Sequence, residues 1–228
     1  MKTRLTGISS MATRQVLVEV ADAWRHAGGE VAFESVGGVE AAQRVQGGEH
    51  LDVVVLAAEA IDKLVAASRI VAGSKTDLAR SAVVLAVRAG ASRPTIDTEA
   101  ALREAVLSAR SIGFSTGPSG VALQQLFERR GIAEVVRPRV VQAPPGVPVG
   151  TLITSGDVEL GFQQLSELMH LEGIDVIGPM PPGLEIVTTF SGGICTVSTQ
   201  ANAARALLDF IRSPAADEAR RRHGMQPA

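Results

Sequence analysis

The stretch LDVVVLAA at residues 51–58 decides the fold class, because a continuous apolar run of this length is typical of a strand buried in a parallel sheet. A helical pattern follows it at 59–67, and two further strand and helix pairs precede it. These pairs are predicted at 3–8 with 11–27, and at 31–35 with 39–45. Three such units in succession predict an α/β protein whose parallel sheet is covered by helices.

The alternation continues in the second half of the chain. Two long extended segments are predicted at 81–90 and 184–198, and two helices, at 201–212 and 214–223, end the chain. Between the extended segments the pattern predicts helices at 98–109, 119–130 and 147–155, and strands at 111–114, 139–142, 158–162 and 174–178. No polar linker interrupts the chain, so any two domains must be joined by ordered strands. The expected division is 1–82 plus 196–228 for lobe 1, and 83–195 for lobe 2.

Composition excludes several classes of function. The chain of 228 residues has 22 basic and 24 acidic side chains, which argues against a nucleic-acid partner. It has 3% aromatic residues and no tyrosine, so an aromatic stacking platform is not expected. The single cysteine, Cys195, rules out an internal disulfide, and no metal-ligand spacing appears. The basic run ARRRHG at 219–224 is predicted to be a solvated helix face. We expect no metal and no cofactor.

The sequence also bears on location. No stretch of roughly 18 apolar residues occurs, so no membrane span is expected. Near the N-terminus, polar residues from Thr6 to Gln15 interrupt the apolar region that a signal peptide needs. The protein is therefore predicted to be cytoplasmic, or periplasmic if a leader has been removed.

Four predicted strand-to-helix loops consist of small or hydroxyl-bearing residues. A helix N-terminus presents unpaired N–H groups and a partial positive charge, and small side chains let an anion approach them. Serine and threonine are also ordinary N-caps, so each loop alone has both interpretations. The loops contain Ser9 and Ser10, then Gly37 and Gly38, then Ala57, and finally Ser115, Thr116, Gly117, Ser119 and Gly120. The last loop is neither a Walker A loop nor GxGxxG, so a nucleotide is not indicated.

The order of several motifs resembles a known family. They are KTRLTGISSM, LDVVVLAAEAIDKL, RSAVVLAV, STGPSGVALQQLFERRGI, GDVELGFQQLSEL and RSPAADEARRRHGM. Together they resemble the type II periplasmic-binding-protein fold, in the branch of the molybdate-binding proteins of ABC transporters. The resemblance implies two α/β lobes with mixed sheets flanked by helices, two crossing strands between the lobes, and a ligand in the cleft. It also implies a possible transporter partner.

The resemblance places ligand contacts at Ser9 or Ser10 and at Ala57. The family's second serine loop falls on Val36-Gly37-Gly38, where only backbone N–H groups remain, and another backbone donor falls near Gly146. The tyrosine that helps to hold molybdate in many members falls near Gln164. Two side-chain donors for an oxyanion are therefore absent, which disfavours molybdate but not another small anion.

Other side chains offer replacement donors. Arg80 precedes the first crossing strand, and its planar guanidinium suits a carboxylate; the alternative is a surface arginine paired with Asp77 or with solvent. Ser81 offers a hydroxyl, or simply starts the strand. Gln163 and Gln164 are predicted to follow a strand, where they either donate amide N–H groups to a ligand or bond their loop neighbours.

This donor set predicts a cleft-type protein that binds a small organic carboxylate or oxyanion. The same family includes aconitate-isomerase-like members, so the alternative is a cofactor-independent isomerase of a small polycarboxylate in that cleft. A third possibility is a sensor or scaffold with a vestigial cleft. An isomerase needs a general base. Glu167 and the four histidines, His26, His50, His170 and His223, are candidates, and none stands out from its sequence context.

Overall fold

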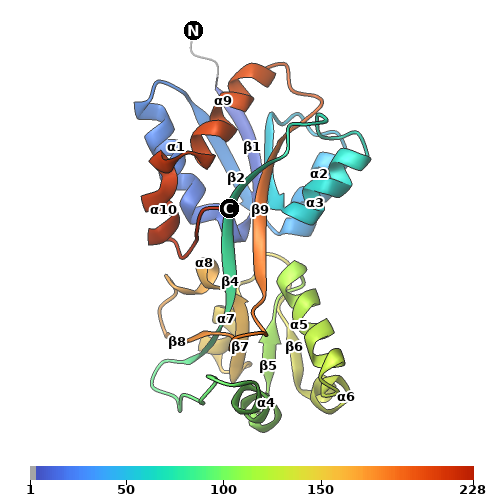
Figure 1. Cartoon of the computed structure of the whole chain (residues 1–228), viewed down its shortest axis with the longest axis vertical. Coiled ribbons are helices and arrows are strands. Elements are labelled where there is room, and N and C mark those ends of the chain that lie inside the picture. The colour runs from blue at the N-terminus through green and yellow to red at the C-terminus, as the bar shows by residue number, and fades with distance from the viewer. Residues whose placement is uncertain (1–3) are drawn as a thin grey trace. The chain divides into compact units, whose positions relative to one another are not determined.

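The computed structural model describes residues 4–228, so Thr3, the first residue of the strand expected at 3–8, lies outside the described residues. The chain forms two compact units. The described part of unit 1 comprises residues 4–81 and 189–228, and unit 2 is Ala82–Thr188. Two strands, β4 (Thr76–Arg88) and β9 (Val187–Ile194), carry the chain from one unit to the other (Figure 1). The predicted α/β fold of two units joined by two crossing strands is confirmed.

The second boundary differs from the expected one. The division falls between Thr188 and Thr189, whereas the sequence places it at 195/196. The reason is strand pairing: from Phe190 to Ile194, β9 pairs antiparallel with β3 (Val53–Ala57), which ties these residues to unit 1.

In unit 1 the strand order is β2-β1-β3-β9. The strand β1 (Leu5–Ser10) runs parallel to both β2 (Val31–Val36) and β3. Alternate residues of β3 enter two different cores: Val53 and Val55 pack with α1, α9 and α10, whereas Val54 and Leu56 pack with α2 and α3. The helices are α1 (Arg14–His26), α2 (Gly38–Gln46), α3 (Ala58–Ala66), α9 (Ala201–Arg212) and α10 (Asp217–Arg222). Burial on both faces explains why this strand is apolar throughout.

In unit 2 the strand order is β4-β7-β5-β6, and β8 (Ile174–Pro179) pairs with β4. The central β5 (Ile112–Phe114) is parallel to β6 (Val140–Gln142) and to β7 (Leu160–Gln164), and β4 is antiparallel to β7. One face packs against α4, α5 and α6, and the other against α7 and α8. The helices are α4 (Glu99–Ser108), α5 (Pro118–Arg129), α6 (Ala133–Val136), α7 (Val149–Ser155) and α8 (Leu165–Leu168).

Several element bounds differ from those predicted, mostly where pairing extends a strand into polar sequence. The strand predicted at 158–162 is β7, which ends at Gln164 because Gln163 and Gln164 pair with Val84 and Val83. Likewise, β1 extends to Ser10 because Ser9 and Ser10 pair with β2. The helix expected at 11–27 begins at Arg14, after a 3₁₀ turn. The helix expected at 214–223 is a 3₁₀ turn, Pro214–Ala216, followed by α10.

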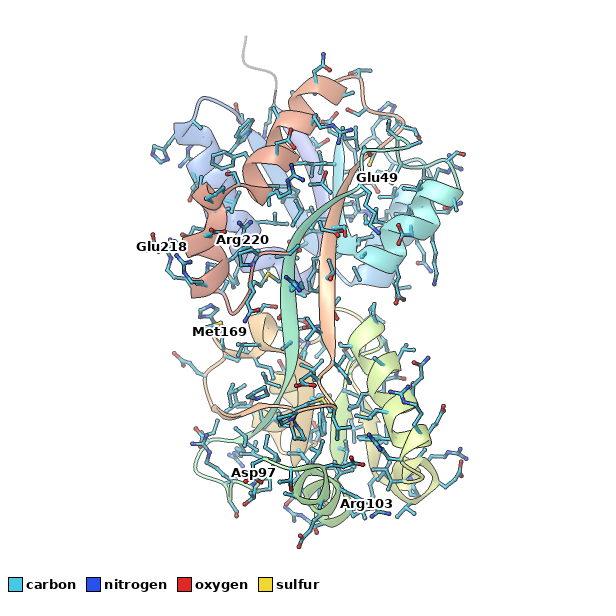
Figure 2. All side chains as sticks on the ribbon, in the orientation of Figure 1. Glu49, Asp97, Arg103, Met169, Glu218 and Arg220 are labelled. Atoms are coloured by element: carbon cyan, nitrogen blue, oxygen red, sulfur yellow. The ribbon has the colours of Figure 1, made fainter. Side chains whose placement is uncertain are left out.

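The basic run at 219–224 is not uniformly solvated. Arg220 is 1% exposed, and its guanidinium donates to the carbonyl oxygens of Ile211, Arg212 (3.3 Å) and Ser213 (2.9 Å) at the end of α9. It also bonds to Asp217 and to the Leu78 carbonyl of β4 at 3.3 Å. Figure 2 labels this side chain on α10. Arg220 therefore ties the last two helices to the sheet of unit 1.

Among residues 4–228, no helix is both long enough and apolar enough to cross a membrane.

Candidate functional site

The carboxyl ends of the three parallel strands of unit 1 bring five predicted residues to one edge of its sheet. Ser9 and Ser10 end β1, Ala57 ends β3, and Gly37 and Gly38 follow β2. We call these residues the unit 1 edge. In an open α/β sheet, ligands bind at the carboxyl ends of the strands.

The two serines of the unit 1 edge differ in their bonding. The hydroxyl of Ser9 lies 2.8 Å from the hydroxyl of Ser35 on β2, so it already has a partner. The hydroxyl of Ser10 is buried and has no hydrogen-bond partner among the described residues, although the residue is only 8% exposed. Buried polar groups are rarely left unpaired, so an unpaired hydroxyl of this kind needs an explanation. The geometry favours Ser10 over Ser9 as the donor to a ligand.

Two helix N-termini belong to the unit 1 edge. Gly37 and Ala57 are the N-cap residues of α2 and α3, and neither has a side-chain cap bond. A Cβ atom added at Gly38 would lie 3.6 Å from Cβ of Ser10, so the first turn of α2 passes close to that serine. First-turn amides that lack a capping side chain remain available to an anion.

A second set of predicted residues lies at the carboxyl ends of β5, β6 and β7 in unit 2. The segment Ser115–Gly120 follows β5, Gly146 lies in a turn after β6, and Gln163 and Gln164 end β7. We call these residues the unit 2 edge. The hydroxyls of Ser115 and Ser119 lie 3.4 Å apart.

The two glutamines of β7 point to opposite faces of the sheet, as strand neighbours do. The side-chain oxygen of Gln163 accepts the N–H of Val149 at 2.7 Å, so Gln163 caps the start of α7. The Nε2 of Gln164 donates to the Thr188 hydroxyl at 2.6 Å, and its buried Oε1 has no partner among the described residues. The Thr188 hydroxyl can donate as well as accept, so a turn of the Gln164 amide keeps this bond and presents Nε2 to an anion. Nothing in the local sequence signals the roles of Val149 and Thr188.

Glu167 lies in α8, directly after the unit 2 edge, two residues before the C-cap residue Met169 that Figure 2 labels. Its side chain is half-buried and accepts a hydrogen bond from Gln163. Burial raises the pKa of this carboxyl to about 7, and the Gln163 bond acts in the opposite direction. Glu167 is therefore close to half-protonated near neutral pH.

This raised pKa predicts a pH-dependent cost to stability. A carboxyl whose pKa is higher in the folded than in the unfolded state favours folding below its unfolded pKa of 4.5, and this contribution is lost as pH rises through about 7. Glu167→Gln removes the cost of burying the charge. The gain in unfolding free energy should be about 1–3 kcal/mol larger at pH 8 than at pH 5. Urea titrations at both pH values measure it. The exposed Glu172→Gln control should show no such difference, and an equal effect in both variants would contradict the prediction.

Arg80 and Ser81 lie elsewhere than expected. They sit inside β4 and not before it, because β4 starts at Thr76. The backbone of Arg80 pairs with Gln226, and its exposed side chain donates from Nε to the Pro227 carbonyl at 3.2 Å. Asp77, the alternative partner suggested for Arg80, accepts instead from the Ser191 hydroxyl at 2.6 Å. Ser81 is buried. The bond to the C-terminal segment favours the surface interpretation of Arg80.

Other chemistries find little support in residues 4–228. No group of three or more histidine, cysteine or acidic side chains there is arranged to hold a metal ion. Cys195 is 2% exposed, and burial, with a smaller contribution from Asp52, raises the pKa of its thiol to about 12. Two candidate histidines have structural partners: His26 bonds the Asp22 carbonyl and His223 bonds Glu19.

Comparison with known proteins agrees with this architecture. The family model described as bacterial extracellular solute-binding protein matches residues 5–226. The chain belongs to this family. A curated relative, an aconitate isomerase from Pseudomonas sp, is 36% identical over 234 residues, which cover 99% of this chain and 88% of the relative.

Solved structures of two binding proteins share the fold. The periplasmic molybdate-binding protein of Azotobacter vinelandii superposes with a TM-score of 0.80 at 19% identity, covering 97% of this chain and 98% of that protein. The sulfate-binding protein SubI from Mycobacterium tuberculosis H37Rv gives 0.79 at 16% identity, covering 99% and 87%. The fold that the resemblance predicted is thereby confirmed.

Proposed function

We propose that this protein binds a small organic polycarboxylate and that each of the two edges described above, taken by itself, offers contacts to an anion. The observation that carries the proposal is the buried, unpaired hydroxyl of Ser10 beside the uncapped N-terminus of α2. Such a site offers N–H and O–H donors and a partial positive charge, which suit an anion. Membership of a solute-binding family supports a small dissolved ligand.

A carboxylate is proposed ahead of an inorganic oxyanion for two reasons. The relative at 36% identity is named for an action on aconitate, a tricarboxylate, whereas the molybdate-binding and sulfate-binding proteins are below 20% identity. The chain also has no tyrosine, the residue that the resemblance places at Gln164 for molybdate.

A thermal-shift panel tests the proposal. The purified chain is melted alone and with molybdate, sulfate, phosphate, citrate, cis-aconitate or trans-aconitate. A ligand present at 100 times its Kd stabilises the folded state by about 2.7 kcal/mol, so a true ligand gives a clear rise in Tm. We expect a tricarboxylate to give the largest rise. A rise with molybdate or sulfate alone would replace the carboxylate with an oxyanion, and no rise with any of them would reject the proposal.

Ser10→Ala should weaken ligand binding without weakening the fold. The Ser10 hydroxyl bonds nothing in the described residues, so its loss costs no internal bond, whereas a lost hydrogen bond to a charged ligand costs about 1.5–3 kcal/mol, or roughly ten- to a hundredfold in Kd. The matched control is Ser198→Ala. Its hydroxyl donates to Asp52, just before β3 at the opposite end of that strand, so this variant should lose stability and keep its affinity. Calorimetry and urea unfolding of both variants separate the two effects; unchanged affinity in Ser10→Ala would remove Ser10 from the site.

The second candidate function is isomerisation of the bound polycarboxylate without a cofactor. It is favoured by the 36% identity to an aconitate isomerase over 99% of this chain. A relative that aligns across both units provides more support for this activity than one matching a single motif.

A transporter partner and the cellular location also belong to this proposal. The family description, extracellular solute-binding protein, favours delivery of the ligand to a membrane transporter. An isomerase has no need of such a partner, so the two functions differ in location. Fractionation of cells that express the full gene separates them: release by osmotic shock supports transport, and retention in the cytoplasm supports the enzyme.

A further inference from the structure

The unit 2 edge is followed by a carboxylate that the binding of an anion does not explain. Glu167 belongs to α8, immediately after β7, and the same sheet edge carries Ser115 and Ser119. A negatively charged side chain beside a site for anions weakens binding, so a purely binding function gives no reason for it. A catalytic function that transfers a proton does give a reason for a carboxylate at this position.

Glu167 also lacks a cation in the elements packed around it. The helix α8 packs on β7, and Leu168 and Leu171 lie against the first turn of α7 at Gly150. The sequences of α7, VGTLITS, and β7, LGFQQ, contain no charged residue, and Glu167 is the only charged residue of α8. The nearest titratable residues along the chain after α8, His170 and Glu172, are exposed. A half-buried carboxyl that receives no cation from α7, β7 or its own helix is unusual in a structural role, because buried acidic groups are normally paired.

Gln163, which bonds the Glu167 carboxyl, is itself held in place. Gln163 donates to the Glu167 carboxyl while its Oε1 accepts the Val149 N–H at 2.7 Å. This second bond sets which end of the amide faces the carboxyl, because the oxygen is already bound to a backbone donor. The carboxylate is therefore oriented by a chain of two bonds that starts at the N-terminus of α7.

We propose that Glu167 removes and returns the proton when a propene tricarboxylate is isomerised at the unit 2 edge, and that Gln163 positions its carboxylate. This inference rests on the second candidate function. A C–H bond of the substrate methylene breaks as an O–H bond to Glu167 forms. The electron pair enters the allyl system, which is conjugated with the carboxylates. The proton then returns to the carbon at the other end, and the double bond moves.

These two proton transfers balance without a co-reactant. No atom is gained or lost and no electron leaves the substrate, so neither an oxidant nor a metal is required. Negative charge that develops on the substrate carboxylates is met by N–H and O–H donors of the Ser115–Gly120 segment at the same edge. A carboxyl with a pKa of about 7 is suited to both halves of the reaction at neutral pH.

The test follows the conversion of cis-aconitate into trans-aconitate by proton NMR, with the full chain. Wild type should convert it, and Glu167→Gln should lower kcat about a hundredfold or more while the calorimetric Kd for trans-aconitate stays within a few-fold. The control Glu172→Gln should match wild type in both. Because the base must be ionised, wild-type kcat/KM should rise with pH up to about 7 and then level off.

Gln163 is tested through the pH profile. Its hydrogen bond lowers the pKa of Glu167, so Gln163→Met should move the acid limb of kcat/KM to higher pH, which a purely structural role would not do. If this variant does not fold, Gln163→Glu keeps an oxygen for the Val149 N–H and should move the limb in the same direction by like-charge repulsion.

The outcomes separate this inference from the binding function. Tricarboxylate binding by wild type without conversion, or conversion by Glu167→Gln at the wild-type rate, overturns the role of Glu167 and leaves binding intact. Failure of wild type to bind either aconitate overturns both this inference and the proposed carboxylate ligand.

Discussion

Arg220→Met should lower the free energy of unfolding of unit 1 by about 3–5 kcal/mol, the usual cost of breaking a buried ion pair by removing one partner. The guanidinium is 1% exposed and holds the carbonyl oxygens of Ile211, Arg212 and Ser213 together with Asp217. Methionine has a similar length but no donor, so it leaves the end of α9 and the Asp217 carboxylate without these bonds. In a chain of this size the expected fall in Tm is roughly 6–20 °C.

The matched control is the next residue. Arg221→Met removes the same charge from the same helix, but at an exposed position, so it should change stability by less than about 0.5 kcal/mol. Urea unfolding is monitored by the fluorescence of the single tryptophan, Trp24. This signal reports on unit 1, where the centroid of the Trp24 ring lies 5.1 Å from that of Phe210. A loss below about 1 kcal/mol for Arg220→Met, or equal losses in the two variants, would contradict the assigned role.

Gly120→Ala should disrupt the Ser115–Gly120 segment and the ligand binding assigned to it. A Cβ atom at Gly120 would lie 1.8 Å from the Ser115 carbonyl oxygen and 3.2 Å from the Phe114 ring. Neither atom is the end of a flexible side chain, so the backbone must move, at a typical cost of about 1–3 kcal/mol. The displaced Ser115 and Ser119 hydroxyls would then lose their positions, and we expect tricarboxylate affinity to fall at least tenfold.

Gly117→Ala, three residues earlier, is the control for that change. Its φ of −78° suits any residue, and the nearest atom to an added Cβ, Oγ of Ser115, lies 3.6 Å away. Stability should stay the same or rise by up to about 1 kcal/mol, since the unfolded chain loses freedom. Thermal melting and calorimetry with trans-aconitate measure both variants. Wild-type stability and affinity in Gly120→Ala would show that the segment neither packs tightly nor contacts the ligand.

The fold was largely predictable because its central strands are buried on both faces. In β3 every residue from Val53 to Ala57 is buried, so an unbroken apolar run predicts a strand without knowledge of its partners. At β7 the same reasoning ended the predicted strand at residue 162, two residues before its end at Gln164. Gln163 and Gln164 are polar, and they are strand residues only because β4 pairs with them, a contact between segments about 80 positions apart.

The sequence predicted which segments form the candidate site, but not which side chains in them are already hydrogen-bonded. Small residues after strands identified both edges, but sequence alone cannot tell that Ser9 bonds Ser35 while Ser10 does not. Glu167 was one candidate among five because its isolation depends on uncharged neighbours from α7 and β7. Arg220 was missed for a related reason. It stands in a run of three arginines, and only the end of α9 distinguishes it from the exposed Arg221 and Arg222.

The burial of Cys195 makes it possible to attach a fluorescent dye to a single introduced cysteine. Its thiol is the only one in the chain, and with a pKa of about 12 it stays protonated and unreactive toward maleimides at neutral pH. A cysteine introduced at Val121, which is 48% exposed and follows Gly120 on α5, would then be the single labelling position. A dye attached there would lie within one helical turn of Ser119, so the arrival of an anion would be read as a change in emission, without the need to know the ligand in advance.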